Sequence, residues 1–257
     1  MIVCRSTAEL ERMREAGRLV GEVLTELAAH VAPGVTTADL DAMAEARITQ
    51  AGATPAFKGY HGYPATICAS INDEVIHGIP SGRRMLNEGD VISIDVGAEL
   101  DGYFGDSALT LPVGPVSEQA ATLLRVTEES LYKAIECVRP GGRISDIGHA
   151  VQQHVEGYGF SVVREFVGHG IGQKMHEEPQ VPNYGERGRG PRLADGMVLA
   201  IEPMVNAGKP SVKVLADGWT AVTTDGSVSA HFEHTVAVTA NGPWILTARD
   251  VPVGARR

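Results

Sequence analysis

Hydrophobic residues recur at helical spacing in four stretches of the chain. The first stretch follows Ser6-Thr7-Ala8-Glu9, which has the spacing of a capping box, and it ends at Pro33-Gly34. The second is capped by Thr36 or Thr37. A Pro-Gly-Gly segment separates the last two stretches. The pattern therefore predicts helices over residues 7–32, 37–50, 117–138 and 144–156.

Shorter apolar runs bounded by glycine, proline and acidic residues predict β-strands. They lie at residues 65–70, 91–96, 103–111, 161–166, 197–205, 212–215, 220–224 and 230–239. With 257 residues, the chain is long enough for one large α/β or α+β domain or for two small ones. No low-complexity tract marks a domain boundary in the sequence.

One strand pattern occurs twice. Residues 88–95 and 195–202 align, and in each segment an acidic-Gly turn leads into an apolar strand that ends in a carboxylate. A second acidic residue follows in each half, although a hairpin inserted near Asp217-Gly218 changes its spacing. Because any buried strand after a turn has this pattern, eight aligned positions are limited evidence for a repeat. The repeat predicts a pseudo-twofold domain with metal ions between its halves.

Composition narrows the classes of function. A content of 43% hydrophobic and 21% charged residues is ordinary for a globular protein. The formal net charge of −10 argues against a nucleic-acid-binding surface, which needs clustered Lys and Arg. No apolar stretch approaches the ~18 residues of a membrane span, and the N-terminus lacks the layout of a signal peptide. The three cysteines form neither a disulfide framework nor a CxxC motif. We therefore expect a cytoplasmic protein with no membrane or nucleic-acid site.

Four carboxylates and one imidazole are the candidate metal ligands: Asp95, Asp106, His169, Glu202 and Glu233. Asp95 and Glu202 end apolar runs, and Glu233 precedes another. An ionised carboxylate in such a setting is costly unless it is paired, protonated or metal-bound, and few cations lie nearby in sequence. The hairpin signal at Asp101-Gly102 would place Asp95 and Asp106 on neighbouring strands, pointing the same way.

Each of these residues alone has a more ordinary explanation. An isolated Asp is usually a turn or capping residue, a lone His is usually structural, and Glu233 in a strand could face outward. The flanking Gly168 and Gly170 favour a ligand role for His169, because they let the backbone approach a cofactor or substrate closely. The joint pattern of the five residues favours a divalent metal centre.

The types of donor atom narrow the choice of metal ion. A structural zinc site would use Cys and His, whereas mostly oxygen donors suit Mn²⁺, Fe²⁺ or Co²⁺, and also allow Zn²⁺. Because carboxylates can bridge, five side chains can hold two ions about 3.5–4 Å apart with an activated water between them. The sequence therefore predicts a metal-dependent hydrolase.

Two further histidines and a group of aromatic residues are candidates for substrate contact. His77 and His176 could face the substrate, or they could be a buried strand-end residue and a surface loop residue, respectively. Trp219 and the group Phe57, Tyr60 and Tyr63 could be plain core residues. Because only 5% of the chain is aromatic, their grouping in one loop favours an apolar pocket wall.

Six segments together resemble those of bacterial type I methionine aminopeptidases: Gly-Tyr-His-Gly-Tyr-Pro (59–64), Ile-Asn-Asp-Glu-Val-Ile-His-Gly-Ile-Pro (71–80), Asp-Val-Gly to Gly-Asp (95–106), Gly-His-Gly-Ile-Gly (168–172), His-Glu-Glu-Pro-Gln-Val-Pro-Asn-Tyr (176–184) and Ile-Glu-Pro (201–203). The resemblance covers essentially the whole chain. It implies the α+β pita-bread fold, with pseudo-twofold mixed or antiparallel sheets and helices packed outside. It also implies a single catalytic domain over residues 1–257, with residues 1–35 as a helix leading into it.

The resemblance implies two divalent metal ions, Mn, Fe, Co or Zn. Asp95 would bind one ion, His169 and Glu202 the other, and Asp106 and Glu233 would bridge them. A hydroxide between the ions would attack the carbonyl of the N-terminal methionine of nascent polypeptides with a small second residue. The implied protein is a monomer, and any contact with the ribosome would use the surface of the domain.

Catalytic and pocket residues are implied by the same resemblance. Glu202 would shuttle a proton to the leaving amine, and His176 would hydrogen-bond the developing oxyanion, a contribution of ~2.7–4 kcal/mol. His77 would contact the scissile amide nitrogen or the following residue. The methionine pocket would be lined by Phe57, Tyr60, Tyr63, Cys68, Met175 and Trp219. Positions 57 and 175 vary within the family, so the resemblance does not fix the pocket shape there.

Three alternatives remain. A proline-specific aminopeptidase of the same fold would carry a sizeable extra N-terminal domain, whereas only about 60 residues precede the aromatic loop. A type II methionine aminopeptidase would need a long insertion that the 30 residues between Glu202 and Glu233 cannot hold. A catalytically silent peptide-binding module of the same fold would have lost ligands, and all five are present.

Overall fold

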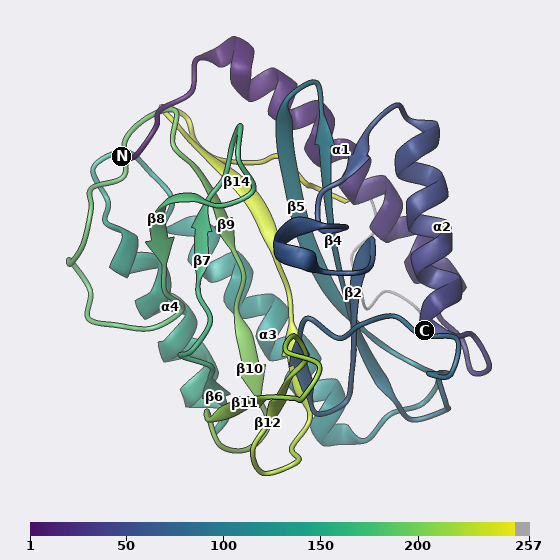
Figure 1. Cartoon of the computed structure of the whole chain (residues 1–257). Coiled ribbons are helices and arrows are strands. Elements are labelled where there is room, and N and C mark those ends of the chain that lie inside the picture. Colours follow the sequence, from purple (N-terminus) through teal and green to yellow (C-terminus); the bar gives the residue numbers. More distant parts are fainter. Residues whose placement is uncertain (250–257) are drawn as a thin grey trace.

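Two pairs of helices pack against antiparallel sheets in the computed structural model, which describes residues 1–249 (Figure 1). The helices are α1 (Thr7–His30), α2 (Thr37–Gln50), α3 (Glu118–Glu136) and α4 (Ile144–Gly157). The strands are β1 (Thr54–Pro55), β2 (Ile67–Ile71), β3 (Glu74–Ile76), β4 (Val91–Leu100), β5 (Tyr103–Pro112), β6 (Ser161–Val162), β7 (Gly168–Gly170), β8 (Glu177–Val181), β9 (Val198–Ile201), β10 (Met204–Asn206), β11 (Val212–Val214), β12 (Ala221–Thr223), β13 (Ser229–His231), β14 (His234–Thr239) and β15 (Gly242–Ile245).

All four predicted helices are confirmed, and the capping residues explain where they begin. The Ser6 side chain accepts from the backbone N–H of Glu9, and the Glu9 carboxylate accepts from the backbone N–H of Ser6 at 2.8 Å. Thr36, rather than Thr37, forms the same reciprocal pair with Asp39 at the start of α2. Each cap satisfies backbone donors that the helix itself leaves free, a contribution of about 1 kcal/mol.

The strands form four antiparallel sheets. In one, β5 pairs with β4 along its whole length, and β2 and β1 pair with successive parts of β4. The largest sheet has the order β15-β14-β9-β7-β8. Two three-stranded sheets, β13-β10-β6 and β11-β12-β3, complete the described part. Asp101 and Gly102 have φ values of 51° and 78°, as a two-residue turn of the mirror-image kind requires, so the hairpin predicted at this position is confirmed.

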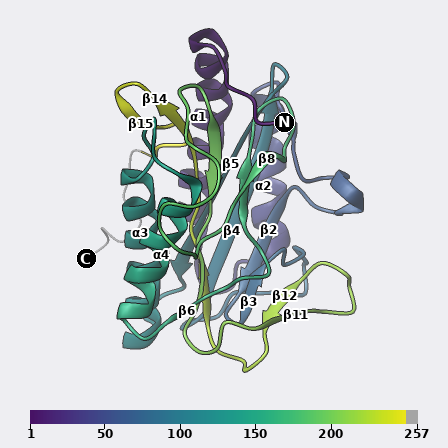
Figure 2. The same ribbon diagram turned by 90° about the vertical axis from the view of Figure 1, so that its left-hand side faces the viewer.

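Each half of the chain supplies one pair of helices. Helices α1 and α2 pack against the sheet of β4 and β5, whereas α3 and α4 pack against strands of the second half, with α4 beside β6 (Figure 2). The aligned segments of the repeat begin their strands at equivalent positions, Val91 in β4 and Val198 in β9. Buried apolar residues of all four helices belong to one core that continues through both halves.

Some strand predictions were wrong. The predicted runs 197–205 and 230–239 each split into two strands, because Pro203 interrupts the first and residues 232–233 leave the ladder in the second. The run 161–166 contains only the two residues of β6. Strands β1, β3, β7, β8 and β15 were not predicted. Strand β7 is Gly-His-Gly and β8 contains Pro179, so neither has an alternating apolar pattern.

Strand β5 joins the two halves. The backbone N–H of Glu233 donates to the carbonyl of Ala108 at 2.9 Å. The Thr235 hydroxyl accepts from the N–H of Asp106 at 3.1 Å and donates to the carbonyl of the same residue at 2.7 Å. Thr235 of the second half therefore holds the backbone of Asp106, and Ala108 of the first half holds the backbone of Glu233. These contacts keep Asp106 and Glu233 close together.

Candidate metal centre

Strand register places Asp95 and Asp106 on one face of the first sheet. Asp95 of β4 lies opposite Cys68 of β2, and Asp106 of β5 lies opposite Gly97 of β4. Positions 95 and 97 face the same side of a strand because side chains alternate along it. Opposite residues of an antiparallel pair also share a face, so the carboxyl groups of Asp95 and Asp106 are diagonal neighbours.

His169 is brought to these carboxylates by β7, which lies between β8 and β9. A side chain at Gly168 would collide with the carbonyl of Ala200 in β9, and one at Gly170 would collide with the carbonyl of Glu178 in β8. The glycines thus allow close packing of three strands. The interpretation that they open the backbone to a cofactor was wrong in its reason, although His169 does face the acidic cluster.

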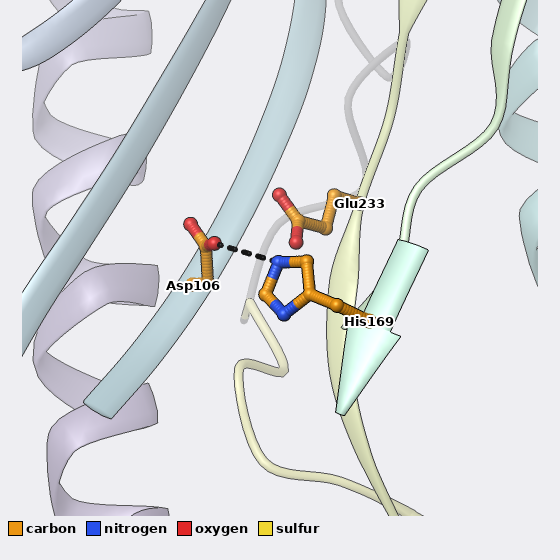
Figure 3. Close-up of side chains that lie close together, drawn as sticks. All are labelled: Asp106, His169 and Glu233. Atoms are coloured by element: carbon orange, nitrogen blue, oxygen red, sulfur yellow. Dashed lines mark ion pairs between the residues drawn. The ribbon is translucent and has the colours of Figure 1, made fainter. Parts of the chain in front are cut away.

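Glu202 and Glu233 both follow the end of a strand. Glu202 lies between β9 and β10, at the end of an apolar run as predicted. Glu233 lies between β13 and β14 and is 1% exposed, so the prediction that it sits within a strand was wrong. The backbone leaves the ladder at Glu233 and donates instead to β5. This break turns its side chain inward, toward Asp106 and His169 (Figure 3).

A hydrogen bond at one ring nitrogen of His169 determines whether the other ring nitrogen is a donor or an acceptor. Nδ1 lies 2.9 Å from the carbonyl oxygen of Gly170, which can only accept, so Nδ1 carries the proton. Nε2 then presents a lone pair. It lies 3.7 Å from Oδ2 of Asp106 and 3.5 Å from Oε1 of Glu202. Three acceptors thus face one another, an arrangement that is favourable only around a cation or a proton.

The surroundings of the four carboxyl groups disfavour their ionised form. Burial raises the pKa of Asp95 to about 7. Burial, followed by the charges of neighbouring carboxylates, raises the pKa values of Asp106, Glu202 and Glu233 well above their usual range. Among residues 1–249, no Lys or Arg side chain forms an ion pair with these four groups. Burial, then His176, lowers the pKa of His169 to about 3, so its ring is neutral.

This donor set fits a divalent cation. One carboxylate oxygen on each of Asp95, Asp106 and Glu233 is buried and has no hydrogen-bond partner among residues 1–249. Buried polar atoms without partners are rare in folded proteins, and an ion is one of the few groups that satisfies several carboxylates together. Ligand atoms of Asp106, His169 and Glu233 lie within 4.8 Å of one another, a separation that one ion can span.

A single cavity of about 250 Å³ joins the acidic cluster to the predicted substrate residues. All thirteen residues predicted for the site line it: Phe57, Tyr60, Tyr63, Cys68, His77, Asp95, Asp106, His169, Met175, His176, Glu202, Trp219 and Glu233. His61 also lines the cavity and was not predicted, although it belongs to the aromatic segment at 60–63. The individual roles of these residues stay predictions.

The other residues that line the cavity are mostly apolar or aromatic, and together they form its apolar end. Phe57 lies against Gly97, where an added Cβ would come within 2.6 Å of its ring. The Tyr63 ring meets the edge of Trp219 at 5.1 Å, and its hydroxyl donates to the carbonyls of Ile67 and Gly78 at 3.0 Å. Burial, then Cys68, raises the pKa of Tyr63, which keeps this hydroxyl protonated.

His176 lies where the acidic and apolar ends meet. Its ring lies 4.1 Å from that of His169 and is stacked on Tyr60, whose hydroxyl is 2.8 Å from Nδ1 of His176. Partial desolvation by the surrounding protein, followed by the charge of His61, lowers the pKa of His176. Burial raises the pKa of Tyr60. The Tyr60 hydroxyl therefore stays protonated, and a neutral His176 keeps one nitrogen free to face the cavity.

His77 adopts a strained backbone conformation. Its φ is 60°, a left-handed value that residues with a Cβ seldom adopt. The ring packs edge-on against Phe166 at 5.7 Å and Trp219 at 6.3 Å. Burial, then His176, lowers its pKa to about 4. A neutral imidazole is thus held at a fixed position in the cavity wall.

Two residues behind the site were missed by the sequence analysis. Arg249 donates to the Ser107 hydroxyl at 2.9 Å, and that hydroxyl donates to the Glu233 carbonyl at 2.6 Å. His231 is buried beside Glu202. His231 precedes Glu233 by two positions, so the period of an extended chain could have indicated it. No local pattern marks Arg249, because its contacts are long-range.

The chain matches the family model for metallopeptidase family M24 over residues 11–240, and it therefore belongs to this family. It is 58% identical over 247 residues to methionine aminopeptidase 1 of Bacillus subtilis, with 96% of this chain and 99% of that protein covered. The structure is similar to that of a methionine aminopeptidase from Thermotoga maritima, with a TM-score of 0.95, 47% identity, and 97% of this chain and 100% of that chain covered.

A prolidase from Pyrococcus horikoshii shares the fold, with a TM-score of 0.78 and 23% identity, covering 98% of this chain and 65% of that chain. These findings confirm the predicted pita-bread fold, the resemblance to methionine aminopeptidases and the predicted class of metal-dependent peptidase. In the described residues, no helix has the length and apolar character that crossing a membrane requires.

Proposed function

We propose that this chain is a metal-dependent aminopeptidase that removes the N-terminal methionine from polypeptides with a small second residue. The observation that carries the proposal is one cavity with two ends of different chemistry. Acceptors of His169, Asp106 and Glu202 converge at one end, and packed apolar and aromatic side chains form the other. The high identity to methionine aminopeptidases supports the same function.

The acidic end would hold divalent metal. We assign the holding groups to the five residues Asp95, Asp106, His169, Glu202 and Glu233, and we propose two ions, Mn, Fe, Co or Zn. When bound, such ions supply Lewis-acid polarisation of the substrate and an activated water. Four carboxylates suit these hard or borderline ions because their donors are mostly oxygen. Neutralisation by the ions would remove the repulsion that raises the pKa values of the carboxyl groups.

The apolar end would bind the methionine side chain. Phe57, Tyr63 and Met175 are buried, and their surfaces suit a flexible thioether, each sulfur–aromatic contact being worth ~0.3–1.5 kcal/mol. A groove of about 830 Å³ adjoins the cavity and shares His169 and His176 with it. The groove runs between the N-terminal residues and β7–β8, and it would accept the polypeptide that follows the methionine.

Three side chains would act on the scissile peptide. We propose that Tyr60 donates to Nδ1 of His176, which leaves Nε2–H of His176 as a donor to the developing oxyanion. His77, held neutral in the wall, would contact the scissile amide nitrogen or the next residue. Glu202 would pass a proton to the leaving amine, a role that competes with its role as a metal ligand.

The test of the function is release of the first residue from Met-Ala-Ser and Ala-Pro-Ala by chelator-treated protein with Mn²⁺ or Co²⁺ added back. Metal-dependent release from Met-Ala-Ser alone is expected. Cleavage before proline would move the protein to the proline-specific branch of the fold. If a folded, metal-binding protein released no residue from either peptide, the result would indicate a binding module instead.

The oxyanion role of His176 has its own test. His176→Ala should lower kcat by about 10²–10³ and change KM by less than about threefold, because the hydrogen bond forms fully only in the transition state. Tyr60→Phe is the matched control, since it keeps the imidazole and removes only the hydroxyl that orients it. An effect of His176→Ala confined to KM would reject the oxyanion role.

The remaining parts of the proposal concern the setting of the reaction. We propose a monomer that works in the cytoplasm on nascent chains and that meets the ribosome through the surface of its domain. The N-terminal methionine of the proposed substrate supports an action on nascent chains, whereas the net charge of −10 argues against contact with ribosomal RNA. Sedimentation of the purified protein and co-sedimentation with ribosomes would test the two statements separately.

A further inference from the structure

The carboxylate of Glu202 lies between two imidazole rings. Oε1 is 3.5 Å from Nε2 of His169, and Oε2 is 3.8 Å from Nε2 of His231. His231 is the last residue of β13 and is 2% exposed. Each oxygen of one carboxylate thus faces a different ring nitrogen, and only the His169 side belongs to the predicted ligand set.

The backbone of His231 is fixed by β5. The N–H of His231 donates to the Thr110 hydroxyl at 2.8 Å, and that hydroxyl donates to the carbonyl of His231, also at 2.8 Å. Met204 of β10 pairs with His231 on the other side. These contacts fix the backbone of His231, and burial of the residue places its ring among packed protein atoms beside Glu202.

Nε2 of His231 has no hydrogen-bond partner within residues 1–249, and it is fully buried. A buried polar atom that stays unsatisfied costs free energy, so a partner in the working protein is expected. N–H···O hydrogen bonds have N···O distances of about 2.7–3.2 Å, so the 3.8 Å separation from Oε2 is not one. A rotation of the Glu202 carboxylate that shortens this distance by less than about 1 Å would make one.

We propose that His231 is a positioning residue whose Nε2–H donates to Oε2 of Glu202 and so keeps Oε1 on the side of His169. Carboxylates that ligate metals are commonly held by such outer hydrogen bonds, whose loss lowers metal affinity by about 10–100-fold. The proposal rests on the proposed function only for the metal-ligand role of Glu202. It gives the two oxygens separate tasks: Oε1 faces the metal side, and Oε2 is anchored.

Three variants test the proposal. His231→Leu removes the donor at similar volume, whereas His231→Gln keeps an amide N–H near the position of Nε2. His234→Gln is the matched control, since His234 is also buried but its two ring nitrogens lie near Thr247 and Tyr132 hydroxyls, outside the cavity. Mn²⁺ is titrated calorimetrically into each chelator-treated protein, and kcat and KM are measured with Met-Ala-Ser.

His231→Leu should weaken Mn²⁺ binding by about 10–100-fold and lower kcat with little change in KM. His231→Gln and His234→Gln should stay within about threefold of the wild type in Mn²⁺ affinity. Unchanged Mn²⁺ affinity of His231→Leu would overturn the proposal. Loss of affinity in His231→Gln as large as in His231→Leu would also overturn it, because the imidazole itself would then be the ligand.

A spectroscopic measurement keeps the test valid if His231→Leu does not fold. Nitrogen-15 spectra of the histidine rings, recorded on the wild type without metal and with Zn²⁺, report which nitrogen carries the proton. The signals absent from His231→Gln belong to His231. We expect Nε2–H in both states, and an Nδ1–H ring would overturn the proposal. Neither the spectra nor the Mn²⁺ titration requires peptidase activity, so a failure of the proposed function would remain distinguishable.

Discussion

The acidic and apolar ends of the cavity are built on opposite principles. Asp106 and Glu233 are 4% and 1% exposed, and each has a carboxylate oxygen that no group in residues 1–249 satisfies. At the apolar end, the hydroxyl of Tyr63 is bonded twice and Phe57 is packed against Gly97. The acidic end is favourable only with a ligand, whereas the apolar end is stable through packing alone.

This difference separates function from stability. Burial of unpaired carboxylates costs several kcal/mol, which the rest of the fold must offset until a cation binds. Burial of the apolar wall contributes to folding by about 25 cal/mol per Å² with or without substrate. A substitution at the acidic end should therefore change metal binding without loss of stability, and one at the apolar end should do the reverse.

The largest expected effect belongs to Asp106→Asn. This variant keeps the shape of the side chain and removes a central charge of the cluster, so Mn²⁺ binding and release from Met-Ala-Ser should each fall by at least ~10³-fold. The metal-free variant should melt no lower than the metal-free wild type, because a buried repulsive charge is gone. Calorimetric Mn²⁺ titration, peptide assays and thermal melts measure the three quantities.

The control is Asp39→Asn, which changes an exposed carboxylate at the start of α2, outside the cavity. It should leave Mn²⁺ affinity and peptide release within about twofold of the wild type. If metal-free Asp106→Asn melted well below the metal-free wild type, the acidic end would contribute to folding, and the contrast between the two ends would be lost.

The second prediction concerns pH, and Asp95→Asn isolates it. The folded-state pKa of Asp95, about 7, exceeds its ordinary value of 3.8, so the folded protein binds the proton more tightly than the unfolded chain. The stability from Asp95 is therefore present below pH 4 and is lost as pH rises toward 7. His77 and His169, whose pKa values are lowered, have the opposite dependence, with stability lost as pH falls below about 6.5.

The difference between wild type and Asp95→Asn cancels most of the histidine contribution. In urea unfolding of the metal-free proteins, the variant should gain stability over the wild type between pH 5 and pH 8. Because only about two pKa units lie between pH 5 and the folded-state pKa of about 7, the upper limit for the gain is ~2.7 kcal/mol. Mn²⁺ at pH 8 should stabilise the wild type more than the variant. A gain that is the same at both pH values would contradict the assignment to the Asp95 carboxyl.

Local sequence signals predicted what local chemistry controls. The capping residues Ser6 and Thr36 marked the helix starts, and strand parity placed Asp95 and Asp106 on one face. The break at Glu233 was not predicted, because its cause is a hydrogen bond to Ala108, far away in sequence.

The short strands and the supporting residues followed no readable pattern either. Strand β7 exists because Gly168 and Gly170 let it lie between two neighbours, which a single sequence does not reveal. Arg249 reaches the site through a contact with β5 and therefore required the tertiary structure, whereas His231 could have been indicated by its spacing of two from Glu233. The convergence of five ligands was inferred from residue types, but their geometry was not.

The smallest expected effect belongs to Met175→Leu at the apolar end. The exchange conserves volume, so it should cost less than about 1.5 kcal/mol of stability. Because Met175 lines the cavity but is not among the acidic groups, Mn²⁺ affinity should not change. The kcat/KM for Met-Ala-Ser should fall by about three- to tenfold, since a soft contact to the substrate thioether is replaced by an alkyl one.

Urea unfolding, Mn²⁺ titration and peptide kinetics on one protein preparation separate these effects. A tenfold loss of Mn²⁺ affinity in this variant would mean that packing at the apolar end also sets the ligand geometry, because His176, the neighbour of Met175, lies against His169.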